Sequence, residues 1–78
     1  MSDIENIVKE FIERSEKNEV KFLKITNKEK LSLEKMTSKY IWAIQKFGNN
    51  SKITRKYERS FCDLISTLRI NGCIKYKI

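Results

Sequence analysis

Residues 51–78 read SKITRKYERSFCDLISTLRINGCIKYKI and carry the signals for a helix, a turn and a strand. Ser51 or Thr54 can cap the helix at its start, and Asn71-Gly72 ends it. Its apolar residues recur every three or four positions, as on one side of an amphipathic helix: Ile53, Tyr57, Phe61, Leu64, Ile65 and Leu68. Residues 73–78 then alternate apolar and basic side chains, which predicts a half-buried strand.

A second helix is predicted immediately before this stretch. Thr26 and Glu29 form a T-x-x-E capping box, and Gly48 with the following Asn-Asn-Ser ends the helix. Apolar residues recur at helical spacing between these limits: Leu33, Met36, Tyr40, Ile41, Ile44 and Phe47. We expect Tyr40 to lie in the core with Tyr57 and Phe61, and Tyr76 to pack against it.

The N-terminal third of the chain predicts a further helix over residues 3–17. Ser2 and Glu5 form an S-x-x-E capping box, and an apolar stripe follows: Ile4, Ile7, Val8, Phe11 and Ile12. Asn18 breaks this pattern. Residues 20–25 are rich in β-branched and aromatic side chains, which predicts a short strand that pairs with residues 73–78.

The predicted order is therefore helix, strand, helix, helix, strand. This indicates a mainly α (α+β) fold over residues 1–78, a single domain with a small two-stranded sheet packed on three helices. Residues 51–78 resemble the last helix and first wing strand of a winged helix-turn-helix domain, with Ile65, Leu68, Gly72 and Ile74 in a similar pattern. The resemblance implies that the third helix enters a DNA groove.

The charge of the chain is unevenly distributed. The formal net charge is +7, yet residues 1–19 carry six acids against three bases. Residues 20–78 carry fourteen bases against four acids. The basic character therefore belongs to the body of the domain, which favours an anionic partner.

The basic residues gather on two predicted helix faces. The predicted nucleic-acid-binding residues are Lys35, Lys39, Trp42, Lys46, Lys52, Arg55, Lys56, Arg59, Lys75 and Lys77. Lys28 belongs to the same stripe as the first three lysines, and Glu58 and Asp63 are expected to lie off the basic centre line of the third helix. A single basic face would be interpreted as the solvated side of an amphipathic helix, but the exposed face of the third helix has few compensating acids, which weakens that alternative. Trp42 could stack on a base or cover a seam against the first helix or the strands.

Catalysis is not expected. The chain contains no histidine, no Gly-rich phosphate loop and no tight carboxylate cluster for a metal ion. Cys62 and Cys73 cannot complete a zinc site, and we interpret both as reduced thiols. No cofactor is predicted. No apolar run approaches the roughly 20 residues that span a bilayer, so we expect an intracellular, cytoplasmic protein without a membrane partner.

Three functional hypotheses follow. The first is a nucleic-acid-binding protein, with DNA favoured over RNA. The second is a small virus-encoded inhibitor or adaptor that binds a host protein through its basic face. The third is a subunit that forms a homodimer through its first helix. Phe, Tyr, Met, Ile, Asn and Lys make up half of the chain, which is typical of an AT-rich genome and fits a viral or phage regulatory factor.

Overall fold

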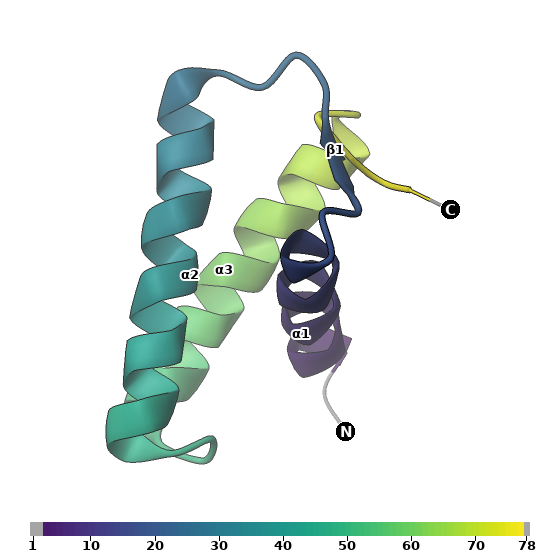
Figure 1. Ribbon diagram of the computed structural model, residues 1–78. Coiled ribbons are helices and arrows are strands. Elements are labelled where there is room, and N and C mark those ends of the chain that lie inside the picture. The colour runs from purple at the N-terminus through teal and green to yellow at the C-terminus, as the bar shows by residue number, and fades with distance from the viewer. Residues whose placement is uncertain (1–2, 78) are drawn as a thin grey trace.

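The computed structural model describes residues 3–77. It confirms the predicted mainly helical fold and the order of its elements (Figure 1). The elements are α1 (Asp3–Glu16), β1 (Val20–Phe22), α2 (Asn27–Phe47), α3 (Lys52–Ile70) and β2 (Ile74–Tyr76). The Ser2 half of the first capping box lies outside the described residues.

Capping residues set the limits of α2 and α3. The Thr26 hydroxyl accepts a 3.1 Å hydrogen bond from the Glu29 backbone N–H, and the Glu29 carboxylate accepts a 3.0 Å bond from the Thr26 backbone N–H, so the predicted capping box is present. Ser51, and not Thr54, caps α3, because its hydroxyl accepts a 3.0 Å bond from the Thr54 backbone N–H. Gly48 ends α2 at φ 83° and ψ 174°, a conformation that essentially only glycine adopts.

Helix α3 is the central element, since both α2 and α1 pack against it. In Figure 1, α2 and α1 stand on either side of α3, which crosses behind them. The Phe61 ring of α3 forms edge-to-face pairs with Phe11 of α1 and Tyr40 of α2, at centroid distances of 5.6 and 6.2 Å. Phe61 is therefore the residue on which all three helices converge.

The two strands form an antiparallel ribbon in the predicted pairing. Val20 lies opposite Tyr76, Lys21 opposite Lys75, and Phe22 opposite Ile74. Both strands are shorter than predicted. Lys24 takes a left-handed conformation at φ 53°, which interrupts the extended backbone after β1, and residue 78 lies outside the described part of the chain.

The core departs from the predicted apolar stripes near the α2–α3 turn. Ile41, Phe47 and Ile53 are 40 to 42% exposed, although they were expected to face the core. Ala43 and Thr54 are buried there instead, and the Thr54 hydroxyl donates a 2.7 Å hydrogen bond to the Gly48 carbonyl. Of the tyrosines expected to be packed, Tyr40 is buried, whereas Tyr57 and Tyr76 are half-buried.

Candidate nucleic-acid interface

One flank of α2 carries the predicted lysine stripe. Lys35, Lys39 and Lys46 are all exposed, and Trp42 on the same flank is 47% exposed. These residues lie roughly 100 to 180° around the helix from Leu33 and Tyr40, which face the core. The flank is therefore free to meet a ligand.

The outer face of α3 presents the second predicted group of cations. Lys52, Arg55, Lys56 and Arg59 are all exposed on the side away from the buried Phe61 and Ile65. Asp63 is also exposed and follows Arg59 by four residues, a spacing that places both on one helix face. The expectation that Asp63 lies off the basic centre line is therefore wrong, and the basic face ends there.

The α2–α3 turn connects the two helices that carry these groups, and we call the two groups together the hairpin surface. Its members are Lys35, Lys39, Trp42, Lys46, Lys52, Arg55, Lys56 and Arg59. Residues 35–57 carry six cations and no acid. Among the described residues, every ion pair belongs to α1 or to Glu19, so none neutralises a cation of the hairpin surface. The excess positive charge is therefore concentrated there.

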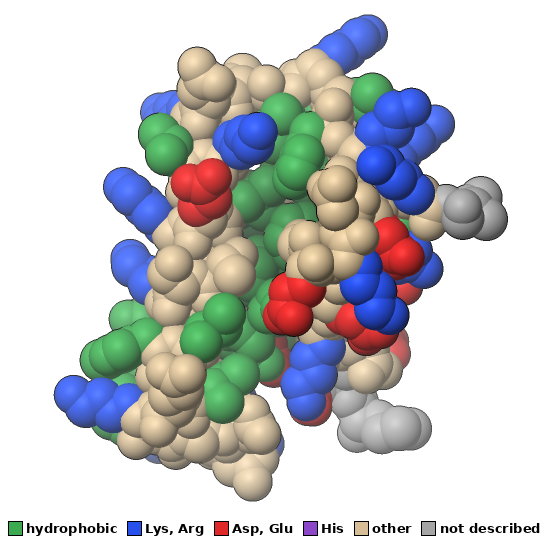
Figure 2. Space-filling view, viewed as in Figure 1, with side chains coloured by type: hydrophobic (Ala, Val, Ile, Leu, Met, Phe, Trp, Pro, Cys, Tyr) green, Lys and Arg blue, Asp and Glu red, His purple; other side chains and the backbone are tan. Residues whose placement is uncertain are grey.

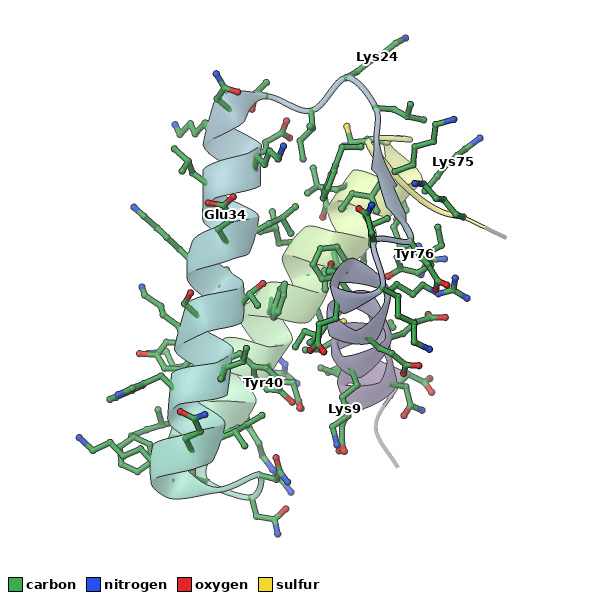
Figure 3. All side chains as sticks on the ribbon, viewed as in Figure 1. Lys9, Lys24, Glu34, Tyr40, Lys75 and Tyr76 are labelled. Atoms are coloured by element: carbon green, nitrogen blue, oxygen red, sulfur yellow. The ribbon has the colours of Figure 1, made fainter. Side chains whose placement is uncertain are left out.

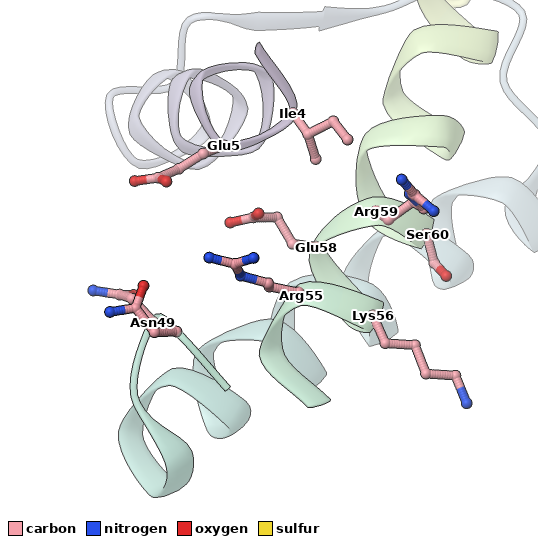
Figure 4. Close-up of a pocket in the computed structure, with 9 residues that line it drawn as sticks. Ile4, Glu5, Asn49, Arg55, Lys56, Glu58, Arg59 and Ser60 are labelled. Carbon is pink, nitrogen blue, oxygen red and sulfur yellow. The ribbon is translucent and has the colours of Figure 1, made fainter. Parts of the chain in front are cut away.

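A hollow of about 660 Å³ lies at one end of the hairpin surface, between the start of α1 and the first turns of α3 (Figure 4). Arg55, Lys56 and Arg59 line it together with the acids Glu5 and Glu58. The Lys9 ammonium holds the pKa of Glu5 below its ordinary value, and Arg55 makes a smaller contribution in the same direction. Arg55 thus lies within electrostatic reach of α1, whereas Lys56 points away from both acids (Figure 4).

Trp42 does not fill a seam in the core. Its ring forms an edge-to-face pair with the exposed ring of Phe47, at a centroid distance of 5.6 Å and an interplanar angle of 85°. The Lys46 ammonium lies 5.2 Å from the Trp42 centroid and 5.7 Å from the Phe47 centroid. Phe47, which periodicity alone assigned to the core, therefore lies on the surface beside Trp42.

Lys75 and Lys77 are separate from the hairpin surface. They belong to the sheet end of the molecule, where Figure 3 places Lys75 far from the α2–α3 turn. Lys21 lies directly opposite Lys75, and the Lys77 backbone N–H donates a 2.7 Å hydrogen bond to the Glu19 carbonyl. The sheet therefore carries a second basic patch that includes Lys21, which sequence reasoning missed because the strand register was needed to find it.

The face between α1 and α2 has a different character. Two hollows of about 480 and 360 Å³ open there. They are lined by apolar residues such as Ile12, Ile41 and Phe11 and by charged residues of both signs: Glu13, Glu16, Glu34, Lys9 and Lys30. Figure 2 shows hydrophobic side chains gathered between the two helices on this side. The two flanks of α2 therefore differ, since the groove uses Ile41 and Ile44 while the lysine stripe lies on the other flank.

The described residues contain no cluster of three or more potential metal ligands, and none of the described helices is long and apolar enough to cross a membrane. Cys62 and Cys73 are free thiols. Comparison of the chain with protein-family models, curated proteins and solved structures gave no significant match. The winged helix-turn-helix resemblance therefore stays a prediction.

Proposed function

We propose that this protein binds nucleic acid through the hairpin surface, and that it acts by binding and not by catalysis. The observation that carries the proposal is the acid-free stretch of residues 35–57, whose six cations have no ion-pair partner among the described residues. Exposed cations gathered on one surface repel each other, and a phosphate backbone relieves that repulsion while releasing its bound counterions.

The two helices supply different kinds of contact. The lysines of α2 act as point charges for phosphate, whereas Arg55 and Arg59 of α3 can make bidentate bonds to phosphate or to a guanine edge. DNA is favoured over RNA in this proposal because the winged helix-turn-helix resemblance would place α3 in a DNA groove. Lys75, on the separate sheet patch, would add a second contact to a ligand long enough to reach both ends of the molecule.

The test is fluorescence anisotropy with labelled duplex DNA, single-stranded DNA and hairpin RNA over a series of salt concentrations. Affinity should fall steeply with salt, by a slope of roughly −0.7 to −0.9 per phosphate neutralised. Reversing Arg55, Lys56 and Arg59 to glutamate should weaken binding by about 100-fold or more and flatten the salt slope.

A matched control keeps the same net charge. The variant Lys9→Glu, Lys17→Glu, Lys24→Glu reverses three exposed cations outside the hairpin surface, two of which make only exposed ion pairs on α1. It should retain most of the affinity. Equal losses in both triple variants would show that only net charge is sensed, which would refute the assignment of the site.

A second candidate function is an adaptor or inhibitor, virus-encoded in the hypothesis above, that binds an acidic surface of a host protein. The exposed pair of Trp42 and Phe47 favours it, because exposed aromatic rings and arginines are frequent anchors of protein interfaces. Nuclease treatment separates the two candidates. A complex bridged by nucleic acid is lost after digestion, whereas a direct protein complex survives and then depends on Trp42.

A further inference from the structure

We propose that the ligand of the hairpin surface is single-stranded, and that an unpaired base stacks on the aromatic platform formed by Trp42 and Phe47. This inference depends on nucleic-acid binding by the hairpin surface, as proposed above. It assigns a single strand as the ligand, and so it replaces the placement of α3 in a duplex groove that the winged helix-turn-helix resemblance would imply. It comes from the geometry of three residues on the last turns of α2: Trp42, Lys46 and Phe47.

The platform has an open aromatic face. Trp42 is 47% exposed and Phe47 is 40% exposed, and their rings meet edge to face. In an edge-to-face pair, one ring offers its edge to one face of the other, so both faces of the first ring remain unused by the pair. A planar base can therefore stack on the platform without displacing either ring.

Lys46 places a positive charge beside the same rings. Its ammonium lies within 6 Å of both centroids and has no acid partner among the described residues. An exposed lysine can exchange this cation–π contact for a phosphate while the base takes its place at the ring. Lys39 and Lys35 continue the row, about two and three turns before Lys46 along α2, where neighbouring phosphates would lie.

A duplex cannot use this platform. Its bases are paired and stacked inside, so a duplex offers an aromatic ring only phosphates, sugars and groove edges. An unpaired base offers a free π-face, and stacking on an aromatic side chain stabilises single-strand complexes irrespective of sequence. Aromatic rings interleaved with lysines therefore favour a single strand over a double helix.

Trp42 is the sole tryptophan of the chain, so its fluorescence reports on the platform alone. The experiment titrates the protein with oligothymidylate, with a duplex of matched length, and with vesicles that contain anionic lipid. We expect oligothymidylate to quench Trp42 in step with binding, and to bind more tightly than the duplex at the same salt concentration. In anisotropy titrations with labelled oligothymidylate, which do not need the tryptophan, Trp42→Ala should weaken binding roughly 5- to 150-fold, and Trp42→Phe should retain most of the affinity.

Leu31→Ala is the matched control, since Leu31 is an exposed apolar residue near the other end of α2, at 56% exposure. It should leave binding unchanged. Duplex binding as tight as single-strand binding, with Trp42 fluorescence unaffected, would overturn this inference and leave the proposed function intact. The absence of salt-dependent binding to any nucleic acid would overturn both. A fluorescence change with vesicles alone would assign the platform to a lipid surface and overturn this inference, while the proposed function would still be decided by the anisotropy titrations.

Discussion

The hydroxyl of Tyr40 donates a 3.0 Å hydrogen bond to a carboxylate oxygen of Glu58. Tyr40 is a buried core residue of α2, and Glu58 lines the hollow at the end of the hairpin surface. The bond connects α2 to α3 beside the cations of α3. It fixes the position of Glu58, which lies between Lys56 and Arg59 in the sequence. Core stability and surface charge are therefore linked through one pair of residues.

This hydrogen bond predicts a stability that depends on alkaline pH. Burial raises the pKa of Tyr40 above its ordinary value of 10.0, and the Glu58 carboxylate raises it further. Because the folded state holds the proton more tightly than the unfolded state, the stabilisation is fully present below pH 10 and declines as pH rises above it. Urea unfolding across this range should show the decline, and Tyr40→Phe should reduce its steepness.

At neutral pH, Tyr40→Phe should lower the free energy of unfolding by about 1 kcal/mol, because Glu58 loses a donor. Burial also raises the pKa of Tyr76, so some alkaline loss should remain in the variant. Identical curves for the variant and the parent protein would contradict the role given to Tyr40.

Glu58 should oppose nucleic-acid binding, since it places a negative charge among Arg55, Lys56 and Arg59. Glu58→Gln can still accept the Tyr40 hydrogen bond, and it should raise affinity about threefold at low salt. The gain should shrink as salt increases. Glu16→Gln, on the groove face, is the control and should have little effect in anisotropy titrations.

Removal of the Tyr76 hydroxyl should not lower the free energy of unfolding, in contrast to removal of the Tyr40 hydroxyl. Its hydroxyl oxygen is buried without a hydrogen-bond partner in the described structure, whereas the Arg14 and Arg69 guanidinium carbons lie 4.9 and 4.8 Å from its ring centroid. Tyr76→Phe keeps the ring and removes the unsatisfied group, so it should leave the protein equally stable or stabilise it by up to about 1 kcal/mol. Tyr76→Leu should destabilise it, as thermal unfolding would show. A clear loss of stability in Tyr76→Phe would contradict this prediction and show that the hydroxyl has a hydrogen-bond partner.

Substitution of Gly48, in the turn between α2 and α3, should lower the stability of the protein. Nothing lies within 4 Å of a methyl group added there, so the cost of Gly48→Ala arises from its backbone conformation and not from a clash. That strain should cost about 1 to 3 kcal/mol. Asn49→Ala, at the next position, should cost much less in chemical denaturation. Equal stabilities for the two variants would show that the turn adapts.

Local signals predicted most of the fold. The Thr26–Glu29 capping box, Gly48 and Asn71-Gly72 set helix limits through hydrogen bonds and backbone angles that depend only on neighbouring residues. The apolar stripes also identified Phe61 and Tyr40 as core residues. These features need no knowledge of the rest of the chain.

Packing between elements could not be predicted in the same way. Ile53 matches the period of its helix, yet Thr54 is the residue that turns inward and bonds to Gly48. Phe47 likewise fits the α2 stripe but pairs with Trp42 on the surface. The strand register decided that Lys75 lies beside Lys21 and far from the hairpin surface. Each outcome depends on the position of a neighbouring element.

The central claim is that the hairpin surface binds nucleic acid, and its most direct test compares two variants of equal charge in anisotropy titrations over a salt series. Reversal of Arg55, Lys56 and Arg59 should remove nearly all affinity and salt dependence, while reversal of Lys9, Lys17 and Lys24 should preserve both. If the parent protein shows no salt-dependent affinity, or if both variants bind like it, the claim is contradicted.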